Sequence, residues 1–83
     1  MDRIEAAAQA LREHFPAHRC CGGLLPPLEI GQAGSDITLR IGRETRSYPS
    51  EQAAISDGLI DWCEHWHRDP DEAWRVLHRL GYV

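Results

Sequence analysis

The spacing of large apolar residues in the second half of the chain is the feature that most constrains its fold. Four of them are separated by four, three and four positions, the spacing that lines one face of a helix: Ile55, Leu59, Trp62 and Trp66. Ser50 precedes this stripe and is a suitable N-cap, because its side-chain oxygen can accept a hydrogen bond from an amide of the first turn. The sequence therefore predicts a helix from Ser50 to about His67, with both tryptophans in the core.

Two further helices are predicted, one near each end of the sequence. The first spans about residues 3–14 and starts with the D-x-x-E signal of Asp2 and Glu5. The last begins after Asp69, an N-cap followed by a proline at the first helical position, and it ends at a left-handed cap formed by Gly81. The apolar faces of these helices are Ile4, Ala8, Leu11 and Phe15 in the first, and Ala73, Val76, Leu77 and Leu80 in the last.

Between the predicted helices, apolar residues alternate with polar ones, as in strands that bury one face. A short strand is predicted at 28–30, a loop over "GQAGSD" at 31–36, and two further strands at 37–41 and 45–48. The chain is therefore predicted to be one small α+β domain, with an antiparallel sheet of two or three strands packed against three helices in the order α-β-β-β-α-α. The predicted core consists of Ile4, Leu11, Phe15, Ile37, Leu39, Ile41, Ile55, Leu59, Trp62, Trp66, Leu77 and Leu80.

Length, charge and the absence of familiar motifs argue against several functional classes. The chain of 83 residues is large enough for one core but not for a cleft between domains. Thirteen carboxylates against nine basic residues give a formal net charge of −4, so a broad phosphate-binding surface is not expected. The sequence contains no catalytic motif, no signal-like start and no apolar stretch of membrane-spanning length. We therefore expect a cytoplasmic protein that is not an enzyme and does not enter a membrane.

Acidic residues repeat at helical spacing on the side of the central predicted helix opposite the tryptophans. Asp57, Asp61 and Glu64 would form a solvent-facing ridge that ends at Arg68. Such a ridge is most simply a solvated surface, but an acidic stripe can also steer association with a basic protein. The favoured hypothesis is a small protein-binding module, an adaptor, regulator or inhibitor, that uses this ridge against a basic partner such as a nucleic-acid-processing protein. The oligomeric state is left open.

Trp74 is a second candidate for contact with a partner. It lies roughly 105° from the middle of the apolar face of the last helix, at about 100° per residue. At that position its indole either closes the core from the side or stands exposed as an interface anchor. The favoured interpretation is that the indole closes the core from the side.

A thiol or zinc site is an alternative hypothesis. Cys63 and His67 are four positions apart on the predicted helix, and Cys20 and Cys21 could add sulfur ligands to a tetrahedral ion. Zinc sites usually present paired cysteines as C-x2-C, however, and adjacent cysteines rarely bind one metal. The simpler interpretation makes Cys63 a small buried hydrophobe and His67 a solvated residue at the helix end, so no metal and no cofactor are predicted.

Nucleic-acid binding through the predicted hairpin is a further alternative. Arg40 should point outward, Arg43 lies at the turn, and the side of Arg46 is not fixed by the alternation. These charges either contact phosphate or protect exposed strands from aggregation. The order helix, three strands, helix over residues 2–67 is similar to that of double-stranded RNA-binding domains. Those domains need a basic start to their second helix, whereas this chain has "SEQAA" at 50–54, so nucleic-acid binding is not favoured.

Overall fold

The structure is a computed structural model that describes residues 2–15 and 25–83. Its elements in chain order are α1 (Asp2–His14), β1 (Glu29–Ala33), β2 (Asp36–Ile41), β3 (Glu44–Tyr48), α2 (Glu51–Ala53), η1 (Ala54–Gly58), α3 (Leu59–His65) and α4 (Pro70–Arg79). The segments α2, η1 and α3 follow one another without a break, and together they are called the central helix, residues 51–65. The predicted α+β class and the order α-β-β-β-α-α are confirmed.

The three strands form an open antiparallel sheet in the order β1-β2-β3. Each connection is a two-residue turn that starts with a glycine in the left-handed region, Gly34 at φ 63° and Gly42 at φ 65°. A glycine at this turn position allows the type II′ geometry, whose twist matches that of paired strands. The predicted loop at 31–36 is therefore wrong. Residues 31–33 extend β1, and the turn is confined to Gly34 and Ser35.

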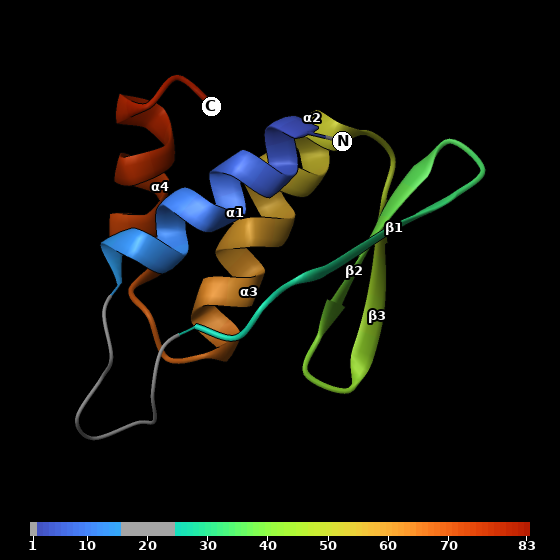
Figure 1. The fold of residues 1–83 in the computed structure, drawn as a ribbon, viewed down its shortest axis with the longest axis horizontal. Helices are drawn as coiled ribbons and strands as arrows, with labels where there is room; N and C mark the ends of the chain where they lie inside the picture. Colours follow the sequence, from blue (N-terminus) through green and yellow to red (C-terminus); the bar gives the residue numbers. More distant parts are fainter. Residues whose placement is uncertain (1, 16–24) are drawn as a thin grey trace.

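All helices lie on one side of the sheet, and the central helix lies between the sheet and the other two helices (Figure 1). Its η1 and α3 segments contact the sheet, whereas α1 and α4 contact the central helix and each other. The sheet turns its apolar side chains toward this layer, where Ile37, Leu39, Ile41 and Tyr48 are buried. One core therefore fills the space between the sheet and the helices.

Gly58 allows the central helix to approach the sheet closely. It is buried in η1, where the amide of Leu59 donates to the carbonyl of Ala54 in the wider π-helical arrangement. A Cβ atom added at Gly58 would lie 2.5 Å from Cδ1 of Leu39 and 3.0 Å from the ring of Tyr48. The helix and the sheet therefore meet at a contact that has no room for a side chain.

Replacing Gly58 with alanine is expected to lower the free energy of unfolding by about 1–3 kcal/mol, the usual cost of overpacking a core. Helix propensity alone predicts the opposite sign, because alanine is favoured over glycine by roughly 1 kcal/mol inside a helix. Urea unfolding followed by far-UV circular dichroism distinguishes the two, with Asp57→Ala as the exposed control beside it. A Gly58→Ala variant more stable than the wild type would contradict the close contact.

The central helix ends earlier than predicted. Trp66 is its C-cap, and His67 adopts the left-handed conformation at φ 61°. The amide of His67 donates to the carbonyl of Glu64 at 3.0 Å. That of Arg68 donates to the carbonyl of Cys63 at 2.8 Å, which completes the pair of hydrogen bonds typical of a Schellman motif. The helix thus ends two residues before the approximate end predicted near His67, a difference that arises because the usual glycine signal for this ending is missing from the sequence.

The predicted caps of the central helix and of α4 are confirmed. The Ser50 hydroxyl accepts a hydrogen bond from the amide of Ala53 at 3.1 Å. The Asp69 carboxylate accepts one from the amide of Asp71 at 2.9 Å. At the other end of α4, Gly81 adopts the expected left-handed conformation at φ 84°. Each cap satisfies backbone groups that the helix itself leaves without partners.

Most of the predicted core is confirmed, including Trp62, which is 1% exposed. Two of its predicted members lie elsewhere. Trp66 is only partly buried at the end of the central helix. Leu80 is 51% exposed at the end of α4. The chain reverses at Gly81, so that Tyr82 rather than Leu80 packs against the core.

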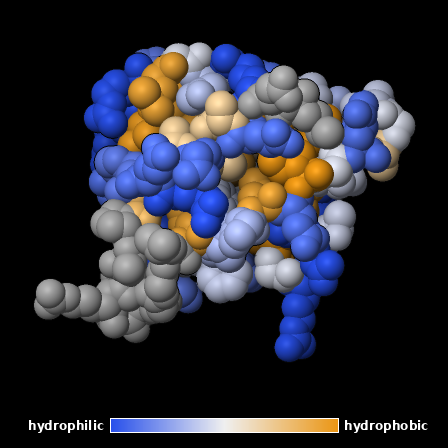
Figure 2. Space-filling model, in the orientation of Figure 1, coloured by the Kyte–Doolittle hydropathy of each residue, from blue (hydrophilic) through white to orange (hydrophobic). Residues whose placement is uncertain are grey.

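The exposed apolar surface does not form one continuous patch on the face drawn in Figure 2, where hydrophilic side chains separate the apolar areas. Among the described residues, the large apolar side chains that are clearly exposed are Trp74 and Leu80, both near or on α4. Within residues 2–15 and 25–83, no helix combines the length and the apolarity that crossing a membrane requires.

Candidate functional site

A groove lies between the β2–β3 turn and the C-terminal end of the central helix. Its volume is about 460 Å³, and it is lined by Ile41, Gly42, Arg43, Glu44, Arg46, His65 and Trp66. We call it the Trp66 groove, because the partly buried indole of Trp66 is its largest apolar group. A smaller hollow of about 140 Å³ also has Gly42 and Trp66 in its wall. Trp66 therefore lines two neighbouring hollows.

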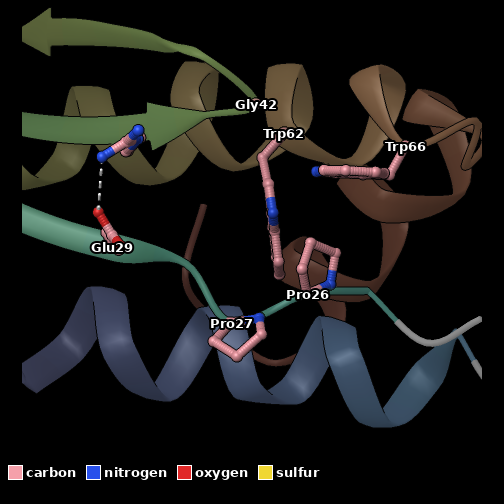
Figure 3. Close-up of a pocket in the computed structure, with 7 residues that line it drawn as sticks. Pro26, Pro27, Glu29, Gly42, Trp62 and Trp66 are labelled. Carbon is pink, nitrogen blue, oxygen red and sulfur yellow. Dashed lines mark ion pairs between the residues drawn. The ribbon is translucent and has the colours of Figure 1, made fainter.

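Tryptophan and proline side chains form the wall of the smaller hollow. Trp62 projects from the central helix toward the extended segment that carries Pro26, and the indole of Trp66 points from the helix end toward Trp62 (Figure 3). Elsewhere along the hollow, Arg40 and Glu29 form an ion pair of 3.7 Å between neighbouring strands. Because Trp62 is almost completely buried, Trp66 and Pro26 provide the accessible apolar surface of this hollow.

Gly42 and His65 fix the shape of the Trp66 groove. A Cβ atom added at Gly42, which already has the positive φ that the turn needs, would lie 2.6 Å from Nε2 of His65. The imidazole therefore lies against the backbone of the turn. It also meets the indole of Trp66 edge to face, with ring centroids 5.1 Å apart. A turn glycine, an imidazole and an indole thus form one contact between the hairpin and the helix end.

The three arginines of the hairpin differ in how their charges are used. Arg40 is paired within the sheet. Arg46 is paired with Glu44 at 3.4 Å and with Asp61 at 3.5 Å, which places its side chain on the helical side of the sheet. Arg43 makes no hydrogen bond or ion pair with another residue in the described part of the chain. It is the uncompensated positive charge of the Trp66 groove.

The predicted acidic ridge is only partly available to a partner. Asp57 and Glu64 are exposed, and neither forms an ion pair with another described residue. Asp61 is bound to Arg46 and accepts a hydrogen bond from the Tyr48 hydroxyl at 3.4 Å. Burial raises the pKa of this hydroxyl, and the charge of Asp61 adds to the rise, so Tyr48 keeps its proton for this hydrogen bond. The middle carboxylate of the ridge is therefore already used within the protein.

The chain reversal after the central helix buries Arg68 and separates His67 from the helical face of Cys63, whereas Cys63 is buried as predicted. Arg68, predicted at the solvent-facing end of the ridge, is 5% exposed, and its Nη1 donates to the carbonyl of Trp66 at 2.8 Å. His67 is exposed beyond the helix end, so the helical i, i+4 geometry expected for it and Cys63 is lost. Cys63 itself is fully buried, and burial raises the pKa of its thiol from 9.0 to about 12.

The surroundings of Cys63 do not form a metal site within the described residues. No group of three or more His, Cys, Asp or Glu side chains in residues 2–15 and 25–83 is placed to hold a metal ion. Cys20 and Cys21, the other sulfur ligands of the zinc hypothesis, lie outside the described residues. Cysteine binds a metal as its thiolate, and burial disfavours that charged form of Cys63 by raising the pKa of its thiol.

Only some of the predicted partner-binding residues come together. Arg43 lines the Trp66 groove, whereas Trp74 is 45% exposed on α4 and is not part of the groove. The favoured prediction that Trp74 closes the core from the side is therefore wrong, and its indole is exposed. Sequence reasoning missed Gly42, His65 and Trp66 as site residues. The one available signal was that Trp66 is the last member of the apolar stripe, next to the residues that end the helix.

Comparisons with known proteins identify no relative of this chain: no family model, no curated protein and no solved structure matches it. The similarity to double-stranded RNA-binding domains is confined to the order of the elements. The start of the central helix carries Glu51, where those domains need basic residues. The function therefore has to be inferred from the geometry and the charges of the Trp66 groove and its surroundings.

Proposed function

We propose that the protein is a non-enzymatic protein-binding module, acting in the cytoplasm as an adaptor, regulator or inhibitor, and that it holds its partner in the Trp66 groove. The observation that carries this proposal is the accessible indole of Trp66 in a concave surface, beside the unpaired guanidinium of Arg43. Tryptophan and arginine are among the residues that most often dominate the binding energy of protein interfaces.

The chemistry of the Trp66 groove supports binding rather than catalysis. Its described lining residues carry no hydroxyl or thiol that could act as a nucleophile. Its imidazole, that of His65, lies against Gly42 and Trp66 and makes no hydrogen bond to another described side chain. Its carboxylate, that of Glu44, is paired with Arg46. The exposed groups of the groove are therefore suited to contact a partner, and none is arranged for proton or group transfer.

The size of the Trp66 groove suits one or two side chains of a partner. Its volume of about 460 Å³ falls in the lower half of the usual range for ligand sites, roughly 300–1,000 Å³. A segment that inserts one or two side chains would bury less surface than a standard interface between two folded proteins. We therefore expect a dissociation constant on the order of micromolar, as for the recognition of a short segment.

A second surface, which consists of Asp57 and Glu64, supports a different kind of partner. Both carboxylates are exposed and have no ion pair in the described part of the chain, so they could meet a basic, nucleic-acid-processing protein. The two surfaces favour partners of opposite charge, because Asp57 and Glu64 attract a basic partner and Arg43 attracts an acidic one. Direct nucleic-acid binding has less support, since Arg40 and Arg46 already have carboxylate partners.

Substitution of Trp66 tests the proposed function. Affinity capture from the native host, followed by mass spectrometry, would supply the partner, which is then purified for isothermal titration calorimetry. We expect Trp66→Ala to raise the Kd by about 30-fold, the effect of losing an anchor worth about 2 kcal/mol. Asp57→Asn combined with Glu64→Gln should change the Kd by less than about twofold, and Trp74→Ala is the matched tryptophan control.

The outcomes of this experiment separate the candidate surfaces. An unchanged Kd for a folded Trp66→Ala variant would show that the groove is not the binding site. Weaker binding by the Asp57→Asn, Glu64→Gln variant, together with loss of the salt dependence, would assign the partner to the acidic surface. An effect confined to Trp74→Ala would assign it to the exposed side of α4.

A further inference from the structure

We infer that the partner presents an extended segment, which adds as a fourth strand along the outer edge of β3 and places an apolar side chain in the Trp66 groove and a carboxylate beside Arg43. This inference rests on the proposed function and names the chemistry of the partner: an acidic and apolar segment in β conformation. Strand addition is a general mode of peptide recognition, in which backbone hydrogen bonds supply affinity and side-chain pockets supply specificity.

The outer edge of β3 carries unused backbone hydrogen-bonding groups. Among the described residues, β3 pairs with β2 and with no other strand. Since a two-residue turn joins them, Ile41 and Glu44 form the first hydrogen-bonded pair, and the ladder alternates from there. Glu44 and Arg46 therefore turn their amides and carbonyls toward β2. Thr45 and Ser47 turn theirs outward, to the open edge.

This edge lacks the proline and the bulge that often keep other strands away. Edge strands are commonly protected by proline, by bulges or by charged side chains. The register of β3 with β2 is regular, without a bulge, and the strand contains no proline. Its charged residues, Glu44 and Arg46, are paired with each other, and Arg46 also reaches Asp61 on the helical side. Thr45 and Ser47 are exposed, so the edge can accept another strand.

The Trp66 groove adjoins the same edge on the helical side of the sheet. Glu44 and Arg46 belong to β3 and also line the groove. In a strand paired with β3, the residues opposite these two would carry their side chains on the same face of the sheet. A large apolar side chain at such a position would lie over the groove and remove part of the Trp66 indole from water.

One charge beside the Trp66 groove, that of Arg43, can attract an acidic group of the segment. Arg46 is already paired with two carboxylates, those of Glu44 and Asp61, so it adds no attraction for a ligand. Arg43 lies at the turn that leads into β3 and has no such partner among the described residues. A carboxylate of the bound segment would complete an ion pair there, whereas a lysine or arginine at the same place would be repelled.

A second copy of the chain is the competing occupant of this edge. Two β3 strands paired antiparallel about Thr45 would place Glu44 of each copy opposite Arg46 of the other. In the same register, Arg43 of each copy would lie opposite Ser47 of the other and would gain no carboxylate. The charges therefore favour a separate acidic segment, and the test includes the dimer as an outcome.

Peptide selection combined with a strand-blocking variant tests the inference. The probe is a phage-displayed library of random dodecapeptides selected on the full chain, and the enriched peptides are labelled for fluorescence anisotropy. Thr45→Pro removes an outward amide without removing a hydrogen bond to β2, whereas Thr45→Val keeps the amide at similar volume. We expect the enriched sequences to alternate apolar residues and to contain Asp or Glu. Their Kd should rise about tenfold for Thr45→Pro and stay within about twofold for Thr45→Val.

Charge reversal at the turn gives an independent readout. Arg43→Glu should raise the Kd of an acidic peptide by about tenfold, and replacing the acidic residue of the peptide with lysine should restore binding to this variant. Arg75→Glu, at an exposed arginine of α4 that does not line the groove, is the matched control. In heteronuclear NMR spectra, the amide signals of residues 44–48 should shift when the peptide is added.

The remaining outcomes each overturn a defined part of the inference. Peptides that depend on Trp66 but bind Thr45→Pro as tightly as Thr45→Val would refute strand addition and leave the proposed function standing. A selection that yields no peptide dependent on Trp66 would refute both. A wild-type dimer in analytical ultracentrifugation that Thr45→Pro dissociates would assign the β3 edge to a second copy of the chain.

Discussion

Replacement of Trp62 by alanine is expected to lower the free energy of unfolding by about 3–5 kcal/mol. The indole is 1% exposed on the central helix, which is enclosed by the sheet on one side and by α1 and α4 on the other. Its removal leaves a cavity that the surrounding helices and strands can fill only partly. A domain of this length has a total stability of roughly 4–12 kcal/mol. In urea titrations followed by far-UV circular dichroism, the variant should therefore start to unfold at little or no denaturant.

Trp74→Ala is the matched control for Trp62→Ala, because it removes the same atoms from a helix at a site that is 45% exposed. We expect it to lower the free energy of unfolding by about 1 kcal/mol or less, since half of its surface already contacts water. Equal effects of the two substitutions would contradict the placement of the helices around the core. Trp66→Ala should lower the free energy of unfolding by an amount between these two, so this variant stays folded for the binding experiments.

The parts of the fold that could be predicted depend on residues close together in the sequence. The cap at Ser50 requires only the amide of Ala53, and the burial of Trp62 follows from helical spacing. The alternation of Leu39 and Ile41 likewise determines which face of β2 is buried. The fold class and the order of the elements follow from such local patterns, because each pattern specifies one element and its apolar side.

The parts that could not be predicted depend on contacts between distant segments or on an uncommon backbone conformation. His67 ends the central helix in a conformation that sequence patterns assign to glycine or asparagine. The burial of Arg68 and the loss of the helical geometry between Cys63 and His67 follow from that turn. Helix propensity makes Gly58 unfavourable inside a helix, yet its missing side chain is what the contact with Leu39 requires.

The candidate site was less predictable than the fold, because it forms where the hairpin meets the helix end. Periodicity places Trp66 on the apolar stripe, but it cannot show that the stripe ends beside the β2–β3 turn. The sequence places Arg43 at the turn, but its unpaired charge stands out only because Arg46 reaches Asp61. The contact of His65 with the turn has no local signal at all, since the two segments are distant along the chain.

Alkaline pH is expected to destabilise the protein through Cys63. Burial raises the pKa of this thiol from 9.0 to about 12, so the folded chain retains a proton that the unfolded chain loses. The stabilising effect is complete below the ordinary pKa and is lost as the pH rises toward the raised value, because the folded state binds more protons between the two. At about 1.4 kcal/mol for each pKa unit, the free energy of unfolding falls by about 4 kcal/mol near the upper end of this range.

Comparison with Cys63→Ala isolates the effect, because this variant has no thiol to ionise at this position. Its free energy of unfolding starts lower, since a buried sulfur is lost, but it should change less between pH 9.0 and 10.0, the ordinary pKa values of Cys and Tyr. Above that range both proteins should lose stability through Tyr48, whose pKa is raised by burial and by Asp61. Denaturant titrations at stepped pH under reducing conditions measure both curves. Parallel curves from pH 9.0 upward would mean that the thiol ionises as easily in the folded chain as in the unfolded one. The burial of Cys63 on the inner face of the central helix would then be wrong.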